Sequence, residues 1–336
     1  MMRYDFTGKN ILVTGATGLI GSHLVRALLK AGAAGVVAMS RSEAKLTQCF
    51  ADLLTDGHFY YVAHDVCKAL PPLPVPPDYI FHAAGPMERK VIAEHPLSVI
   101  GPNIAGTKNC LEYLLGQSQD ESGKQGRLVL FSSVTVYGNN TQEDRSVSED
   151  DTDVTGKLSA FNAVYAESKR MSEVLAQAYI SECDADVVIA RLSTVYGPTF
   201  FEPDSAFYEF IRHAAQDEDI VLQCVDAPRR DNIYVGDAVN GLMVIALRGE
   251  IGVAYNISSN GEGDNFGSIV DIAKMAIREA DFVFKRKGKA KVVYHQKTLE
   301  GRKPGLIMNN KCLHDLGWRL ETNMRDGIRA TLKTQK

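Results

Sequence analysis

The sequence predicts an α/β fold in which helices cover both faces of a doubly wound parallel sheet. Short apolar runs alternate with amphipathic helical stretches through about the first 195 residues, and a glycine-rich turn joins the first run to the first helix. Such alternation is typical of parallel sheets, because each crossover helix returns the chain to the edge where the previous strand began. A chain of 336 residues has room for one large unit of this kind or for two closely packed lobes.

Six apolar runs have the composition of strands that are buried on both faces. They are residues 10–14, 35–39, 59–63, 79–83, 127–133 and 186–192. Between the first two, residues 22–32 have the apolar period of an amphipathic helix. The proline-rich segment 71–77 is predicted as a loop before the fourth strand, since proline removes a backbone donor. Residues 143–153 are acidic and lack an apolar period, which predicts an exposed loop.

The alternation becomes less regular beyond residue 198. Helices are expected near 205–216, 237–248 and 266–281, and strands at 232–235 and 254–258. We therefore expect the first unit to span residues 1–198, with 232–258 returning to it. Residues 199–231 and 259–336 are expected to form a smaller interleaved C-terminal lobe that binds the substrate.

Composition argues against several classes of function. The 37 Lys and Arg residues against 41 Asp and Glu residues, a formal net charge of −4, disfavour nucleic acid or a membrane surface as the main partner. No stretch reaches the apolar length of a membrane span, and the N-terminal residues do not resemble a signal peptide. The six cysteines are scattered without a CxxC pair, which is typical of reduced thiols rather than of a disulfide frame or a metal site. We expect a cytoplasmic protein.

Three glycines lie between the first strand and the first helix, in the order GxxGxxG. The first allows a tight turn, the second lets a diphosphate approach the backbone, and the third lets the helix pack closely on the strand. The helix N-terminus then faces the phosphates with its amide dipoles. This pattern predicts a Rossmann-like dinucleotide site. Its expected contacts at the turn are Gly15, Thr17, Gly18, Leu19, Ile20 and Gly21.

The residues that end the second strand bear on the choice of cofactor. An acidic residue there would bind the ribose 2′-hydroxyl and select NAD. The chain has Ser40 and Arg41 instead, whose donors suit the 2′-phosphate of NADP. Stacking of Arg41 on the adenine is the alternative, and it is compatible with either cofactor. The sequence therefore predicts NAD(P), with NADP slightly favoured.

The third and fourth strands end in further candidate cofactor contacts. Asp65 is placed to accept from the adenine amino group, with the Val66 amide donating to the ring; the alternative is that Asp65 caps a turn. Ala83, Ala84 and Gly85 are small enough for the nicotinamide-side ribose to approach the backbone, although ordinary packing would select the same residues.

A tyrosine and a lysine four residues apart form the candidate catalytic pair. Tyr165 and Lys169 share one face if the segment is helical. A phenol titrates near pH 10 when unperturbed, and a nearby ammonium together with a cationic nicotinamide would stabilise the phenolate as a base. Ser133 and Thr135 follow the fifth strand, where a hydroxyl would bind the same substrate oxygen.

Motifs along nearly the whole chain resemble the extended short-chain dehydrogenase/reductases, and in particular their nucleotide-sugar epimerase/dehydratase family. The stretches that carry the resemblance are TGATGLIGSHL, FHAAG, NIAGTKNCLE, SSVTVYG, YAESK, VYGP, RRDNIYVGDAV, YNISS and LGW. The resemblance implies bound NAD(P), with hydride exchanged with a sugar carbon. It implies that Tyr165 is the general base and acid, and that Lys169 lowers its pKa and binds the nicotinamide ribose. Ser133, with Thr135 beside it, would bind the reacting hydroxyl, and Asn103 matches a recurrent active-site asparagine.

Departures from the family pattern narrow the implied chemistry. Family dehydratases carry Asp-Glu in the strand-end motif and decarboxylases carry Glu, whereas this chain has Val-Thr-Val at 134–136, as 4-epimerases do. Glu88 either replaces the missing carboxylate or faces solvent. Thr194 stands where members often have an asparagine that touches the sugar nucleotide. Arg230 and Arg302 match arginines that would bind the diphosphate; surface ion pairs are the alternative.

The leading hypothesis is an enzyme that oxidises C4 of a nucleotide-activated sugar and, by reducing the keto intermediate on its other face, epimerises it. The alternative is an NADPH-dependent 4-ketosugar reductase, and a non-catalytic dinucleotide sensor is the third. Family members dimerise through helices near 96–115 and 162–180, so the resemblance also implies a homodimer. We expect Trp318 to contribute to packing rather than to ligand binding.

Overall fold

A computed structural model describes residues 4–86, 89–117, 125–138, 144–151, 158, 163–222, 229–295 and 305–335. Its largest element is a seven-stranded sheet in which every pair of neighbours is parallel. In spatial order the strands are β11 (Ala254–Ile257), β7 (Val187–Leu192), β5 (Arg127–Ser133), β4 (Tyr79–His82), β1 (Asn10–Thr14), β2 (Gly35–Ser40) and β3 (Phe59–Ala63). The predicted parallel sheet and its six N-terminal strands are confirmed.

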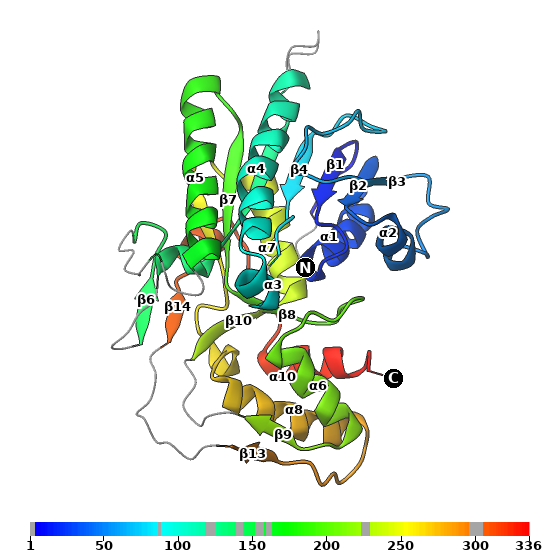
Figure 1. Cartoon of the computed structure of the whole chain (residues 1–336), viewed down its shortest axis with the longest axis vertical. Helices are drawn as coiled ribbons and strands as arrows, with labels where there is room; N and C mark the ends of the chain where they lie inside the picture. The colour runs from blue at the N-terminus through cyan, green and yellow to red at the C-terminus, as the bar shows by residue number, and fades with distance from the viewer. Residues whose placement is uncertain are drawn as a thin grey trace.

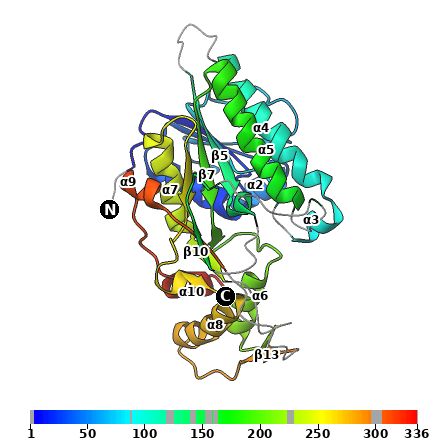
Figure 2. The same cartoon turned by 90° about the vertical axis from the view of Figure 1, so that its left-hand side faces the viewer.

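Helices cover both faces of this sheet, as Figure 2 shows. One face packs on α1 (Leu19–Lys30), α2 (Glu43–Cys49) and α7 (Val235–Arg248) through a continuous apolar core. The other face packs on α4 (Leu97–Gln117) and α5 (Ala163–Cys183), which lie side by side; α3 (Arg89–Glu94) precedes α4. The proline-rich segment 71–77 is a loop before β4, as predicted.

A second, smaller sheet connects the large sheet to the C-terminal part of the chain. Its strands are β12 (Phe266–Gly267), β10 (Arg230–Tyr234), β14 (Leu306–Met308) and β6 (Arg145–Val147), and β8 (Thr194–Tyr196) also pairs with β10. Short 3-10 turns flank these strands at Val134–Tyr137 and Gly263–Asn265. Of the two late strands expected from the sequence, the first therefore lies in the small sheet and the second, β11, in the large one.

A separate apolar core forms the lobe below the large sheet in Figure 1. It joins α6 (Ala206–Gln216), α8 (Ile269–Val283) and α10 (Met324–Leu332), with β9 (Ile220–Leu222) and β13 (Val292–Tyr294) beside them. The short helix α9 (Lys311–Asp315) packs instead against β11 and α7. Among the described helices, none has the length and apolarity to cross a membrane.

Two boundaries differ from expectation for local reasons. Helix α1 begins at Leu19 rather than at residue 22, because the glycine turn ends at Gly18, which serves as its N-cap. Helix α8 begins at Ile269, because Ser268 and Asp271 form a capping box that ends the preceding strand-like segment.

The prediction of an exposed loop over residues 143–153 is wrong for the part that the structure describes, residues 144–151. Arg145 to Val147 form β6, which pairs in parallel with β14, and the Val147 side chain is buried. Asp151 accepts hydrogen bonds from the Ser148 backbone and hydroxyl. The acidic composition reflects carboxylates that bind neighbouring donors, and the strand's partner lies about 160 residues away, beyond the reach of a local pattern.

Candidate functional site

The glycine turn packs closely against the residues that follow β4. Gly15 has φ +66°, a left-handed conformation that glycine adopts without strain. A Cβ on Gly15 would lie 2.8 Å from the Ala83 carbonyl carbon and the Ala84 nitrogen, and one on Gly21 would collide with the Gly15 carbonyl oxygen. The structure therefore brings the turn, the start of α1 and the Ala83–Ala84 segment together. Thr17, Leu19 and Ile20 lie within or directly after this turn, and all three are half-buried.

The ends of β2 and β3 bring Arg41 and Asp65 close to each other. The backbone N–H of Cys67 holds the pKa of Asp65 below its usual range, and the positive charge of Arg41 adds to this effect. Ser40 is the last residue of β2, and the Arg41 side chain is exposed. Asp65 thus makes the turn-capping contact, accepting from the Cys67 N–H at 3.1 Å, while Val66 is buried.

A buried histidine that sequence reasoning missed fixes the end of β4. His82 Nδ1 lies 2.8 Å from Thr14 Oγ1, and its Nε2 lies 3.0 Å from the Pro102 carbonyl oxygen. Burial lowers the pKa of His82 to about 3, so the ring is neutral at ordinary pH. Nε2–H then donates to the carbonyl and Nδ1 accepts from the threonine. Thr14 Oγ1 also accepts from the Ala84 N–H at 3.3 Å, which orients the segment leading to Gly85.

Tyr165, Lys169 and Ser133 come together in the interior, and each is less than 10% exposed. Tyr165 and Lys169 lie one turn apart on α5, and the Lys169 Nζ is 5.9 Å from the centroid of the tyrosine ring. The ammonium donates to the carbonyl oxygen of Phe131 at 2.7 Å. Ser133, the last residue of β5, hydrogen-bonds the Tyr165 side chain. The arrangement presents two hydroxyls and one ammonium at the end of β5.

Burial dominates the electrostatics of this group. It raises the pKa of Tyr165 to about 12, and the Ser133 hydrogen bond acts in the opposite direction. Burial lowers the pKa of Lys169 to about 8, and the Glu173 carboxylate acts in the opposite direction. With these protein groups alone, the phenol keeps its proton at neutral pH.

Two buried oxygens beside this group have no hydrogen-bond partner within the described parts of the chain. They are Asn103 Oδ1 and Thr135 Oγ1. The Asn103 amide nitrogen donates to Ser168 Oγ at 2.8 Å, and its oxygen faces Gly85, 2.9 Å from where a Cβ would stand. Buried polar atoms in native proteins almost always have partners. Together with the glycine turn, these atoms fit the polar ribose and amide groups of a dinucleotide.

The remaining candidates lie elsewhere. Thr194 begins β8 and Arg230 begins β10, so both belong to the small sheet, where the Arg230 side chain is exposed. Glu88 and Arg302 lie outside the described residues. Trp318 is 1% exposed and donates to the Asp237 carbonyl at 3.1 Å, so its predicted packing role is confirmed.

A glycine turn between β1 and α1 of a parallel sheet, together with a buried Tyr–Lys pair at the end of β5, is typical of a dinucleotide-binding α/β protein. Residues 11–258 match the NAD dependent epimerase/dehydratase family. The chain is 25% identical to dTDP-glucose 4,6-dehydratase of Shigella flexneri (96% of this chain, 91% of the relative) and 28% identical to UDP-glucuronic acid decarboxylase 6 of Arabidopsis thaliana (96% and 87%).

Among solved structures, the chain resembles UDP-glucuronic acid 4-epimerase from Bacillus cereus in complex with UDP-glucuronic acid and NAD. The TM-score is 0.75 at 25% identity, over 96% of this chain and 98% of that one. The family match covers most of the chain, and these relatives align over nearly its full length. The protein therefore belongs to the NAD-dependent epimerase/dehydratase family, and it is an enzyme.

Proposed function

We propose that this enzyme transfers hydride between NAD(P) and C4 of a nucleotide-activated sugar, and that it acts as a 4-epimerase. The observation that carries the proposal is the buried contact between Tyr165 and Ser133 beside Lys169, at the end of β5 next to the glycine turn. Residues 1–198, with 232–258, are assigned to the cofactor. Residues 199–231 and 259–336 are assigned to the sugar nucleotide.

In this proposal the side chains move one proton and orient one hydroxyl. When bound, NAD(P)⁺ would supply the hydride acceptor and a positive charge. Ser133 Oγ binds the C4 hydroxyl, and Tyr165 accepts its proton as hydride leaves C4. Because burial by itself raises the pKa of Tyr165 to about 12, the phenolate depends on nearby positive charge. Lys169 supplies part of that charge and has two N–H donors left for the nicotinamide ribose.

The turn after β5, Val134–Tyr137, favours epimerisation over the dehydration and decarboxylation for which the two sequence relatives are named. Its side chains at 134–136 are Val, Thr and Val, so this turn supplies no carboxylate for elimination of water or for decarboxylation. The alternative function is reduction of a 4-ketosugar by NADPH, and the observation that favours it is Arg41 at the end of β2.

The test of the function combines cofactor release with a substrate panel. Purified enzyme is heat-denatured, the released cofactor is assayed, and fresh enzyme is incubated with UDP-, dTDP-, GDP- and CDP-sugars. Tightly held NAD(P)⁺ with interconversion of a C4 epimer pair supports the proposal. Turnover of a 4-ketosugar with consumption of NADPH would identify the reductase instead. Absence of turnover with every sugar would favour the non-catalytic dinucleotide sensor.

We further propose a preference for NADP, based on Arg41. Arg41→Asp is expected to weaken NADPH binding about 10- to 100-fold relative to NADH, because a charge-assisted contact to the 2′-phosphate contributes about 1.5–3 kcal/mol. Fluorescence titration with both reduced cofactors measures the ratio. Lys30→Asp, an equal change of charge at the far end of α1, is the control and should leave the ratio unchanged. An unchanged ratio of NADPH to NADH affinity in Arg41→Asp would show that Arg41 does not bind the 2′-phosphate.

We also propose a homodimer through α4 and α5, in a cytoplasmic enzyme. Ile100 on α4 and Met171 and Val174 on α5 are 40, 54 and 61% exposed on these adjacent helices. Exposed apolar side chains gathered on one face are typical of protein interfaces. Met171→Lys with Val174→Lys should give monomers by light scattering, whereas Ile251→Lys, on the turn after α7, should not. A monomeric wild type at micromolar concentration would contradict this proposal.

A further inference from the structure

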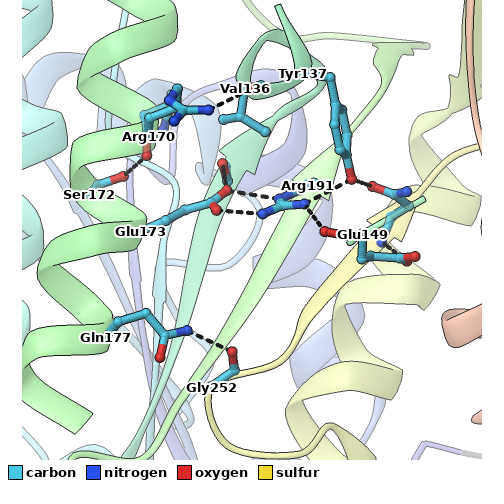
Figure 3. Close-up of polar contacts among 12 residues, drawn as sticks. Val136, Tyr137, Glu149, Arg170, Ser172, Glu173, Gln177, Arg191 and Gly252 are labelled. Carbon is cyan, nitrogen blue, oxygen red and sulfur yellow. Dashed lines mark hydrogen bonds and ion pairs between the residues drawn. The ribbon is translucent and has the colours of Figure 1, made fainter. Parts of the chain in front are cut away.

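A charged cluster centred on Glu173 lies directly behind the Tyr165–Lys169 pair. Glu173 follows Lys169 by four residues on α5, so their side chains share one helix face. The Glu173 carboxylate accepts from the Ser132 hydroxyl. It also accepts from Arg191, at 3.1 Å from Nε and 2.8 Å from Nη2 (Figure 3). Both side chains of this ion pair are less than 15% exposed. It is therefore a nearly buried bidentate pair.

Helix α5 holds the end of β5 through this cluster. Lys169 binds the carbonyl of Phe131, Glu173 binds the hydroxyl of Ser132, and Tyr165 binds Ser133. Three consecutive strand residues thus each contact one functional side chain of the same helix. Arg170 adds a fourth contact, to the Val136 carbonyl at 3.3 Å in the turn that follows.

Arg191 extends the cluster across the sheet. It lies opposite Ser132 on β5 and opposite Asn256 on β11, so the three residues form one row across adjacent parallel strands. Its Nη1 donates to the Tyr137 hydroxyl at 3.0 Å and to the Glu149 carbonyl at 2.8 Å. The Tyr137 hydroxyl in turn donates to Asn256 Oδ1 at 2.7 Å. The pair therefore ties α5 to both ends of the turn that carries Thr135.

We propose that Glu173 and Arg191 are a positioning pair for the reaction. Glu173 keeps Lys169 protonated as a hydrogen-bond donor, and Arg191 weakens the attraction between the Glu173 carboxylate and the Lys169 ammonium. This inference rests on the proposed function, in which Lys169 donates to the nicotinamide ribose. Neither residue of the pair is assigned a contact with the substrate.

The groups around Lys169 support this division of roles. In the described part of the chain, the titratable or charged side chains that face it are Tyr165 and Glu173 on α5 and His82 on β4, with Arg191 on β7 behind Glu173. Tyr165 and His82 are neutral at ordinary pH. Glu173 is therefore the anion that opposes the desolvation of Lys169, and Arg191 also pairs with this carboxylate.

The test is the pH dependence of NADH binding, followed by fluorescence from neutral to alkaline pH. Affinity should fall as Lys169 loses its proton. Glu173→Gln should move the midpoint of this fall to lower pH by about one unit or more, the usual effect of removing a nearby opposite charge. Arg191→Gln should move it to higher pH, because the carboxylate then interacts with Lys169 alone. A purely structural pair would not produce shifts of opposite sign.

Two further variants keep the test decisive. Where Glu173→Gln leaves Arg191 buried without its partner and the protein does not fold, the double variant Glu173→Gln/Arg191→Gln removes both charges, and its midpoint should lie below that of wild type. Asp186→Asn is the matched control. It breaks the Arg127–Asp186 pair, which lies at the opposite ends of β5 and β7 from Ser132 and Arg191. It should lower the unfolding temperature without moving the midpoint of NADH binding.

The outcomes separate this inference from the proposed function. Midpoints that stay at the wild-type value, or that move in the same direction in both single variants, would overturn the positioning pair even if a sugar is epimerised. Opposite shifts support the pair even if no sugar in the panel is converted, because NADH binding requires no sugar substrate.

Discussion

Tyr165→Phe is expected to lower turnover by about 10²- to 10⁴-fold, the usual contribution of a positioned general acid or base. The ring remains to fill the buried site, and the variant loses one hydrogen bond to Ser133, a cost of about 1 kcal/mol. Stability and cofactor affinity should therefore stay close to wild type. The measurement is steady-state turnover of the sugar nucleotide that the panel identifies, with NADH titration and thermal unfolding of the same preparation.

Tyr255→Phe is the matched control for this variant. Tyr255 is also buried, and its hydroxyl accepts one backbone hydrogen bond, from Glu250 at 3.0 Å. It should lose a similar amount of stability and keep its turnover. Undiminished turnover in Tyr165→Phe would refute the catalytic role of the tyrosine. An equal loss of turnover in both variants would attribute the effect to stability.

Gly21→Ala is expected to give the largest effect on cofactor binding. A Cβ at this position would collide with the Gly15 carbonyl oxygen and lie 2.8 Å from Ala16 Cα, so α1 would have to move away from the turn. Overpacking of this kind costs about 1–3 kcal/mol. Because the same displacement would move the helix N-terminus that is proposed to face the diphosphate, affinity should fall by about 5- to 150-fold. Urea unfolding and NADH titration measure the two effects.

Gly116→Ala provides a control at a helical glycine that is exposed. Gly116 is also helical, near the end of α4, and a Cβ there would meet nothing within 4 Å. Alanine in an open helical position is favourable by about 0.5–1 kcal/mol relative to glycine. Gly116→Ala should therefore be slightly more stable, with unchanged cofactor affinity. Normal NADH affinity in Gly21→Ala would show that the close approach of α1 to the turn is not needed for binding.

Much of the fold could be predicted from local patterns. The parallel strands appear in the sequence as unbroken apolar runs, and the glycine turn and the four-residue spacing of Tyr165 and Lys169 are readable from neighbouring residues. The proximity of Arg41 and Asp65 also follows from fold class, because consecutive strands of a doubly wound sheet end at the same edge.

Other features of the site could not be predicted from local sequence patterns. The neutral state of His82 depends on its burial and on the positive charge of Lys169, which is distant in the chain. Glu173 does carry a sequence signal, since it is four residues from Lys169, but that spacing alone does not distinguish a buried partner from a solvated charge. The pKa of Tyr165 also differs from a simple expectation, because desolvation raises it and outweighs the hydrogen bond with Ser133.

The class of fold, the glycine turn and the candidate catalytic side chains could all be recognised without tertiary information. These depend on the conformations and periodicities of residues that are close in the chain. By contrast, two features became apparent only in the folded chain: the row of Ser132, Arg191 and Asn256 across the sheet, and the strand at residues 145–147. Strand register is set by pairing between distant segments, so the environment of a charged residue is defined only when those segments meet.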